Sequence, residues 1–214
     1  QLGIGAVLRT ARDATLSLQF ADGSRLLLQG DSELRLDRMS RYGKSGMVDT
    51  RLRLQRGRIT NDVIPTRGAA PGFIVETPNA SSAVRGTHFR VNATADRTQA
   101  EVTEGSVAVS AGRRHALVRK NHGAVVSLDQ AGTLRAVALL PAPDLRDSSA
   151  RYRGTQARFQ WPAIPGARGY RVQASNTSTF DTLILDTETT EPAVTLPELQ
   201  QGEYALRIRG IDVA

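Results

Sequence analysis

The chain has 214 residues, of which 40% are apolar and 23% charged, so it can bury one large β core or two modest cores and is not expected to be disordered. It contains no cysteine, which excludes disulfides, thiolate metal ligands and cysteine nucleophiles, and no apolar run long enough to predict a membrane span. The net charge is +7: residues 1–136 carry 20 basic and 12 acidic side chains, against eight and nine in residues 137–214. The basic first part suits an anionic partner, but nucleic-acid binding is not expected because no dense basic run is interleaved with aromatic residues.

Short alternating apolar runs separated by turn residues predict an all-β first part. Leu16, Leu18 and Phe20 alternate before a turn at Asp22-Gly23-Ser24, and pairing of Phe20 with Leu26 predicts a hairpin with Gly23 at positive φ. The other predicted strands of this part are Glu33 to Leu36, Thr50 to Gln55, Phe73 to Thr77, Thr87 to Asn92, Ala100 to Thr103, Ser106 to Ser110, Ala116 to Arg119 and Ala124 to Leu128.

Two glycine-containing stretches, Arg38 to Asp49 and Pro65 to Gly72, are predicted as mobile surface loops. The prolines that begin at Pro141 predict a boundary, so residues 1–136 form a first domain and residues 137–156 a linker that could supply the first strand of the next. Residues 157–214 then form a second domain, with predicted strands at Ala157 to Trp161, Gly169 to Ala174, Thr182 to Leu185, Ala193 to Leu196 and Glu203 to Ile211.

Two adjoining segments carry a more specific pattern: Arg85-Gly-Thr-His-Phe-Arg-Val91, then Glu104-Gly-Ser-Val107. Together they resemble the signature of the FecR-like periplasmic domain, and earlier elements from Gly5 onward stand in the order of that family. The resemblance covers roughly residues 3–128. It implies a β-sandwich or a rolled, solenoid-like β domain.

Physical reasoning gives these motif residues a structural role. Gly86 and Thr87 precede a strand on which Phe89 and Val91 share a face, so Gly86 suits a bulge or a close backbone approach. A tight reversal at Glu104-Gly105 would leave the valines on both sides of it on one apolar face, with Gly105 at positive φ. We therefore expect a folding role for both glycines.

The second part resembles a fibronectin type III-like module, a small immunoglobulin-like β-sandwich, over roughly residues 141–214. Trp161 ends its first clear strand, and alternation predicts a core position for it rather than a sugar-binding platform. The run into Tyr204 resembles a tyrosine corner, in which the phenol hydroxyl bonds to upstream backbone. The closing edge strand of such a module is not found before Ala214, so we expect the module to be incomplete at its C-terminal end.

No catalytic, metal-binding or cofactor-binding residue is predicted. None of His88, His115 and His122 has a second ligand at the spacing of a zinc site, and no nucleophile elbow supports a triad of Ser81, His88 and Asp96. No glycine-rich loop leads from a strand into a helix to hold phosphates. The sequence therefore predicts a protein that is not an enzyme.

The favoured hypothesis is a non-enzymatic interaction or sensing protein, exported to the periplasm or cell envelope. The combination of modules resembles wall-associated architectures in which a peptidoglycan-binding LysM module often sits upstream, here before Gln1. The resemblance also allows two alternatives: a periplasmic regulator of sigma-factor signalling coupled to an outer-membrane receptor, and an accessory region of a polysaccharide-processing enzyme. The expected partner is an envelope protein or an anionic glycan, with Arg51 and Arg53 on an outward strand face as the candidate contact. The sequence does not predict the oligomeric state.

Overall fold

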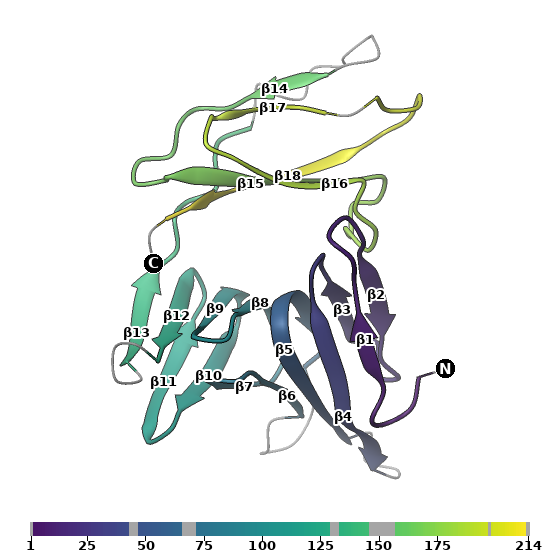
Figure 1. The fold of residues 1–214 in the computed structure, drawn as a ribbon, viewed down its shortest axis with the longest axis vertical. Helices are drawn as coiled ribbons and strands as arrows, with labels where there is room; N and C mark the ends of the chain where they lie inside the picture. The colour runs from purple at the N-terminus through teal and green to yellow at the C-terminus, as the bar shows by residue number, and fades with distance from the viewer. Residues whose placement is uncertain are drawn as a thin grey trace. The chain divides into compact units, whose positions relative to one another are not determined.

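In a computed structural model, residues 2–42, 47–65, 72–128, 133–145, 157–196 and 198–212 can be described. Their regular structure consists of β-strands, which confirms the predicted all-β class (Figure 1). No helix among these residues is long and apolar enough to cross a membrane. The chain divides into unit 1, Gln1–Leu139, and unit 2, Leu140–Ala214, which are described separately below.

Unit 1 contains thirteen strands, most of them short. They are β1 (Val7–Arg9), β2 (Leu16–Gln19), β3 (Arg25–Leu28), β4 (Glu33–Tyr42), β5 (Met47–Val63), β6 (Phe73–Glu76), β7 (Ser81–Val84), β8 (Thr87–Ala93), β9 (Arg97–Glu104), β10 (Ser106–Ala111), β11 (Arg114–Arg119), β12 (His122–Ser127) and β13 (Thr133–Ala138).

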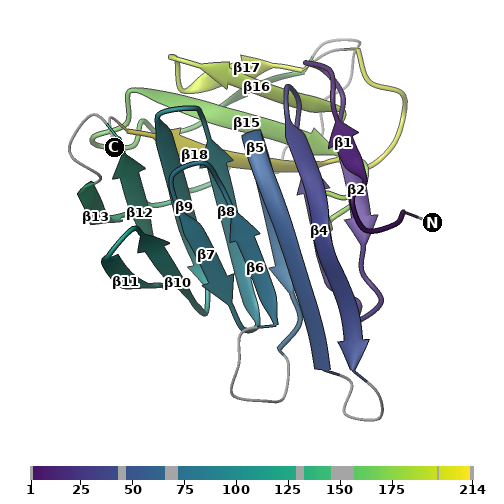
Figure 2. The same cartoon turned by 60° about the horizontal axis from the view of Figure 1, so that its bottom comes forward.

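These strands form two layers that share β5. Layer A has the order β1-β4-β5-β6-β7-β10-β11, in which β5 and β6 are parallel and the other neighbours antiparallel. Layer B has the order β2-β3-β5-β8-β9-β12-β13, and all of its pairs are antiparallel. Figure 2 shows β4, β5, β6, β7, β10 and β11 following one another across layer A.

The strand β5 passes from layer A into layer B at Gly57. Its first part, up to Arg56, pairs with β4, and the part from Gly57 onward pairs with β8. Gly57 has a φ of 92°, and a Cβ there would lie 2.5 Å from the Cα of Ser32. Only glycine combines this backbone angle with this close approach, so Gly57 fixes the corner between the layers.

Strict alternation of buried and exposed side chains builds one core between the layers. In β8 every second residue from Thr87 to Ala93 is buried, and β9 alternates in the same way. In β5 Leu52 and Leu54 are buried, as predicted. Buried side chains of both layers form a single hydrophobic cluster, which is the reason the short strands are stable.

The predicted register of the first hairpin is wrong by two residues. Leu18, rather than Phe20, lies opposite Leu26, and Phe20 donates its backbone N–H to the carbonyl of Ser24. The side chain of Asp22 accepts bonds from the backbone N–H of Ser24 (2.9 Å) and from its hydroxyl (2.9 Å). This turn centres the loop one residue earlier in the chain than the apolar pattern suggested, so each residue of β2 pairs two residues away from its predicted partner. Because side chains alternate along a strand, a register shift of two residues leaves the same face of β2 directed inward.

The loop predicted from Arg38 to Asp49 is also corrected, because β4 continues to Tyr42 and β5 begins at Met47. An ion pair between Arg38 and Asp49, 3.0 Å long, joins the two strands within this stretch. These strand ends could not be predicted from apolar alternation, because neither face of them carries a run of apolar residues. In the second predicted loop, residues 66–71 lie outside the described residues.

Unit 2 contains two small sheets. Strand β14 (Arg158–Gln160) pairs with β17 (Ala193–Thr195), and the second sheet has the order β16 (Leu185–Thr189), β15 (Gly169–Ser175), β18 (Ala205–Ile211). Its core is centred on Trp161, Ile164, Tyr170, Val172 and Ile208. Of the segment 137–156 predicted as a linker, residues 146–156 lie outside the described residues.

Candidate functional site

The two motif segments meet at one corner of unit 1. Gly86 has a φ of 73°, and a Cβ on it would lie 2.7 Å from the Cα of Pro65. Gly105 has a φ of 77°, and its Cβ would lie 2.8 Å from the carbonyl oxygen of Gly86. The hydroxyl of Thr87 donates a 3.0 Å hydrogen bond to the carbonyl of Ser106. The corner is therefore held by backbone packing that excludes larger residues.

The turn at Glu104-Gly105 is an arch between the layers rather than the predicted reversal within one sheet. Strand β9 before it pairs with β8 and β12 in layer B, whereas β10 after it pairs with β7 and β11 in layer A. A second arch at Lys120-Asn121 joins β11 to β12, and the N–H of Lys120 donates to the carbonyl of Gly105 (3.1 Å). The valines around both turns thus face each other across the core.

Three further residues that the sequence analysis singled out, Phe89, Gly23 and Glu104, lie within or at the ends of strands and turns of unit 1. Phe89 is fully buried and makes an edge-to-face contact with Phe73, whose ring centroid is 6.4 Å away. Gly23 adopts the predicted positive φ, 88°, next to the side chain of Ile64. Glu104 is exposed at the end of β9, opposite His88.

The outward arginines predicted as a partner contact lie among carboxylates. Arg53 forms ion pairs with Asp37 (2.9 Å) and Glu76 (3.1 Å), and Arg51 lies 3.7 Å from Asp49. The side chain of Arg51 is 43% exposed and that of Arg53 is 44% exposed. We call these five residues on β4, β5 and β6 the paired arginine face. Because acids on β4, β5 and β6 neutralise most of its charge, it offers a partner less than two free cations would.

A different group of cations, which sequence reasoning missed, lies around β11 at the margin of layer A. Arg113, Arg114, Arg119 and Lys120 are exposed, and so is Leu117, by 54%. Among the described residues no ion pair reaches Arg113, Arg119 or Lys120. We call residues 112–121 the cationic margin. One signal could have found it, because residues 105–128 contain four basic side chains and no acidic one.

The residues considered for a catalytic triad, Ser81, His88 and Asp96, do not form one. The ring Nδ1 of His88 lies 3.7 Å from a carboxylate oxygen of Asp62 on the adjacent strand. Asp96 accepts a hydrogen bond from the hydroxyl of Thr94 in a turn (2.7 Å), and this bond lowers the pKa of its carboxyl. Ser81 belongs to β7 of layer A, while His88 belongs to β8 of layer B. Among the described residues, no hydrogen bond or ion pair joins any two of the three side chains.

One further carboxyl has a shifted pKa. Glu33 on β4 accepts a 3.0 Å hydrogen bond from the guanidinium of Arg9 on β1. This bond lowers the pKa of Glu33 and raises that of Arg9. Both side chains lie at the surface, where such a pair stabilises little. The pair therefore helps to hold the edge strand β1 and has no catalytic setting.

In unit 2, Trp161 is a core residue, 5% exposed, in edge-to-face contact with Tyr170 at 5.3 Å between ring centroids. The hydroxyl of Tyr170 accepts the backbone N–H of Ile164 (3.1 Å). The hydroxyl of Tyr204 donates to the backbone carbonyl of Gln200 (2.9 Å), which is the kind of bond expected from a tyrosine corner.

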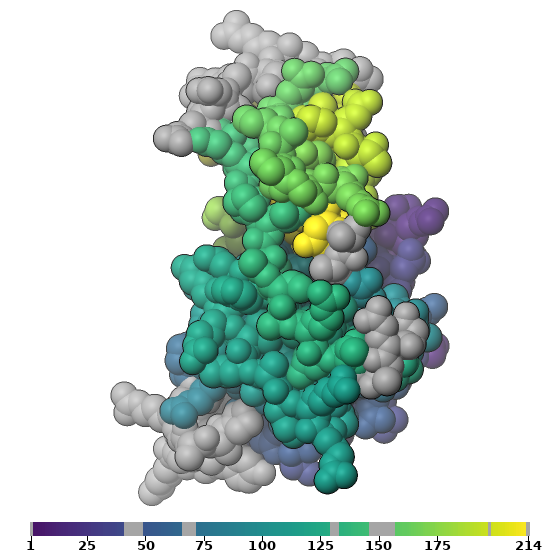
Figure 3. Space-filling model, turned by 90° about the vertical axis from the view of Figure 1, so that its left-hand side faces the viewer, coloured from purple at the N-terminus to yellow at the C-terminus, as the bar shows by residue number. Residues whose placement is uncertain are grey.

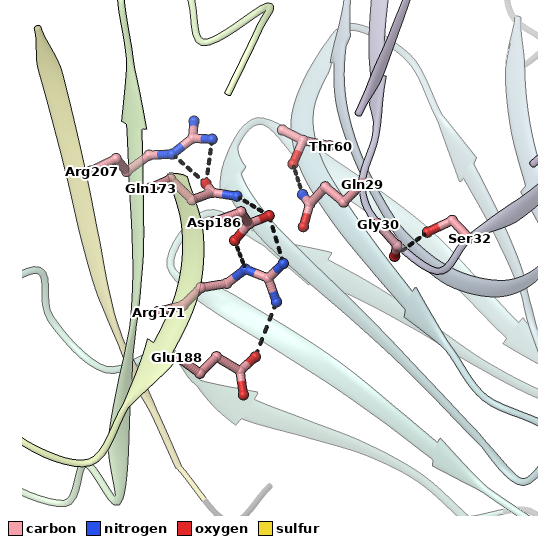
Figure 4. A network of polar contacts seen from close by, with 9 residues as sticks. All are labelled: Gln29, Gly30, Ser32, Thr60, Arg171, Gln173, Asp186, Glu188 and Arg207. Carbon is pink, nitrogen blue, oxygen red and sulfur yellow. Dashed lines mark hydrogen bonds and ion pairs between the residues drawn. The ribbon is translucent and has the colours of Figure 1, made fainter. Parts of the chain in front are cut away.

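A polar network covers the sheet of β16, β15 and β18 (Figure 4). The guanidinium of Arg171 donates to both carboxylate oxygens of Asp186 (2.7 and 2.8 Å) and to Glu188 (3.0 Å). Gln173 donates to Asp186 (3.0 Å) and accepts from Arg207 (2.7 Å). Since each residue has a partner on the neighbouring strand, the network joins the three strands.

The geometry thus defines a two-layer β domain with a closely packed motif corner and two contrasting charged surfaces. Residues 6–108 of this chain match the family model described as FecR protein. This match runs from the residue before β1 into β10, so it lies entirely within unit 1.

Two solved structures resemble the fold of the chain. Both are of a protein from Parabacteroides distasonis described as a putative anti-sigma factor, with 19% and 18% sequence identity and TM-scores of 0.51 and 0.52. In each case the likeness covers 62% of this chain and 59% of that chain, so the match spans under two thirds of the length of the solved protein. No curated protein matches the chain.

Proposed function

We propose that the chain is a non-enzymatic, partner-binding part of a regulator of sigma-factor signalling, with unit 1 as its FecR-like domain. The observation that carries the proposal is the family match over residues 6–108. The similarity in fold to a protein described as an anti-sigma factor supports it. This function was an alternative in the sequence analysis, and the comparisons favour it over a wall-linked interaction protein.

The residues of the motif support a binding role more than a chemical one. Gly86, Thr87 and Gly105 hold a corner of the fold, and the polar side chains near them bond to backbone or to neighbouring strands. A domain of this kind acts through the surface that its layers present. We place it in the periplasm or cell envelope, where a regulator of this family would meet its partner.

Transcript analysis tests the proposal. The coding gene is deleted in the source bacterium and restored on a plasmid, and all transcripts are counted in the three strains. We expect a change of several fold confined to promoters of one alternative sigma factor, reversed by the plasmid. Unchanged transcription would contradict the proposal, and binding of the purified chain to peptidoglycan sacculi would then favour the wall-linked function.

A screen of hydrolase substrates tests the non-enzymatic part separately. We expect no turnover by the purified chain. Reproducible hydrolysis that one substitution abolishes, for example His88→Ala, would contradict this part of the proposal.

We also propose that unit 2 is a fibronectin type III-like module. Three features support this: the pairing of β14 with β17, the order β16-β15-β18, and the bond from Tyr204 to Gln200. If the corner bond stabilises unit 2, Tyr204→Phe should destabilise that unit by about 1 kcal/mol, measured by urea unfolding of the chain. Loss of stability in unit 1 instead would contradict this role for Tyr204.

A further inference from the structure

Strand β11 ends layer A with an open edge, and among the described residues no ion pair reaches Arg113, Arg119 or Lys120 beside it. Strand β11 lies at one end of layer A and pairs only with β10 (Figure 2). Figure 3 shows unit 1 from the side on which β11 and β13 lie in Figure 1, with teal atoms of this part of the chain at the surface.

The backbone direction along β11 follows from its hairpin. Ala111 and Arg114 flank a two-residue turn, in which Gly112 has a φ of 57° at the first central position. Residues that flank such a turn exchange both of their backbone bonds, and bonded and non-bonded pairs then alternate along the ladder. His115, Leu117 and Arg119 therefore direct their N–H and C=O groups away from β10, toward the open edge.

The side chains of the same three residues point away from the core. Val118 is buried opposite Val107, so its neighbours Leu117 and Arg119 lie on the outward face. Leu117 is 54% exposed. At the two ends of the strand stand the cations of the cationic margin. The edge thus combines unpaired backbone groups, one exposed apolar side chain in the middle and positive charge at each end.

Proteins blunt exposed edges with short strands, prolines or bulges. The edge strands β1 and β2 are three and four residues long, whereas β11 has six residues, no proline and no shift in its register with β10. Strand β13 is equally long but carries one charged residue, Arg135. Among the described edge strands of unit 1, only β11 joins a long, regular edge to several cations, of which Arg113, Arg119 and Lys120 form no ion pair with a described residue.

We infer that β11 binds an extended acidic polypeptide segment, which adds to layer A as a further strand. The inference deepens the proposed function, because it names the docking edge of the binding domain. The segment carries an apolar residue opposite Leu117 and carboxylates toward both ends, near Arg113 and Arg119. Backbone bonds supply affinity, and the charges select the acidic partner.

The same features disfavour two other occupants. A second copy paired antiparallel through β11 would bring Arg119 of one molecule near Arg113 of the other, which is repulsive. An anionic glycan would satisfy the cations but has neither the regular backbone donors and acceptors that the edge requires nor an apolar side chain for Leu117. A polypeptide meets all three requirements.

The test uses the whole chain and a labelled synthetic peptide of about eight residues, the length of a strand, with glutamates toward both ends and valine in the centre. Binding is measured by fluorescence anisotropy. Leu117→Pro removes an N–H that points to the open edge and none that bonds to β10, so we expect it to weaken binding about tenfold or more. The matched variant Leu117→Thr keeps that N–H, and we expect its Kd within about threefold of the unmodified value.

Two further measurements keep the test decisive if the proline variant folds poorly. On binding, the amides of residues 115, 117 and 119 should gain protection from hydrogen exchange, while those of 116 and 118 are protected already. Arg119→Glu with Lys120→Glu should weaken binding about tenfold, whereas Arg12→Glu, on an exposed side chain elsewhere in unit 1, should change it little.

Several results would overturn the inference. Equal binding by the proline and threonine variants, or no new protection at the three edge amides, would remove strand addition. Equally strong binding of dextran sulfate would show a general anion surface instead, and self-association lost in Leu117→Pro would show a second copy. The assay contains no sigma factor or promoter, so its failure would leave the regulatory function standing, whereas unchanged transcription in the deletion strain would leave the docking edge standing.

Discussion

The paired arginine face and the cationic margin belong to the same layer and differ in what surrounds their charges. On the first, Asp37 on β4, Asp49 on β5 itself and Glu76 on β6 lie within 3.7 Å of arginine nitrogens. At the second, no acidic residue occurs over residues 105–128. A net charge counted along the chain therefore does not reveal where charge is available to a partner, because strand pairing decides which cations meet acids.

The largest expected effect concerns the corner that supports the cationic margin. Gly86→Val would add a branched side chain at a position where even a Cβ alone would lie 2.7 Å from the Cα of Pro65. We expect a loss in the free energy of unfolding of about 2 kcal/mol or more, measured by urea denaturation. His88→Ala, two residues away and at the surface, is the control and should change little. Equal stability of the valine variant and the unmodified chain would show that the close packing of Gly86 against Pro65 is not needed for stability.

Chromatography on a sulfonate resin compares the two surfaces directly. Arg119→Gln with Lys120→Gln and Arg51→Gln with Arg53→Gln remove the same formal charge. We expect the first pair to lower the eluting salt concentration more, because those cations have no acidic partners to screen them. The same shift for both variants would erase the distinction between the surfaces.

The paired arginine face should in turn contribute more to stability than the margin does. Arg53→Gln leaves Asp37 and Glu76 with one partner fewer, and we expect a loss of about 0.5 kcal/mol because the side chains are partly exposed. Arg119→Gln breaks no ion pair and should leave the urea midpoint within error. A larger loss in Arg119→Gln would reverse the assignment of roles.

The smallest expected effect is a pH dependence of stability from Glu33 on β4, which pairs with Arg9 on the edge strand β1. Because its hydrogen bond with Arg9 lowers the pKa of Glu33, the folded state holds this carboxylate charged more strongly than the unfolded state does. Its contribution is present above the unfolded pKa of about 4.3 and is lost as the pH falls through the lower folded value. Glu33→Gln should therefore lose slightly less stability on acidification than the unmodified chain, as measured by melting temperature. An identical pH profile would exclude the contribution.

Alternation of apolar residues was sufficient to predict most of the strands and the inward face of each. Strand β8 shows why: Phe89 and Val91 stand two apart and are both buried. Strand β7 was missed because Ser81 to Val84 contains small residues whose burial depends on the strands beside them. The sequence also could not distinguish an arch from a hairpin at Gly105, since both need a two-residue turn with positive φ and differ only in the partners of the flanking strands.

The candidate surfaces were harder to predict than the fold. Arg51 and Arg53 were recognised as outward from their neighbours Leu52 and Leu54, but the acidic partners of Arg53 lie on other strands, up to 23 residues away in the chain. The edge character of β11 was equally hidden, because the end of a sheet is defined by which strands do not pair with it. Only the acid-free run over residues 105–128 was available in the sequence.

The sharing of β5 by the two layers has a consequence for how unit 1 unfolds. The layers cannot separate without distorting β5, because its residues up to Arg56 pair within layer A and its residues from Gly57 pair within layer B. The layers are thus not independent folding modules. Loss of structure in one layer is expected to destabilise β5 and, through it, the other layer. Unit 1 should behave as a single cooperative block, in which the slowest amides to exchange with solvent lie along the middle of β5.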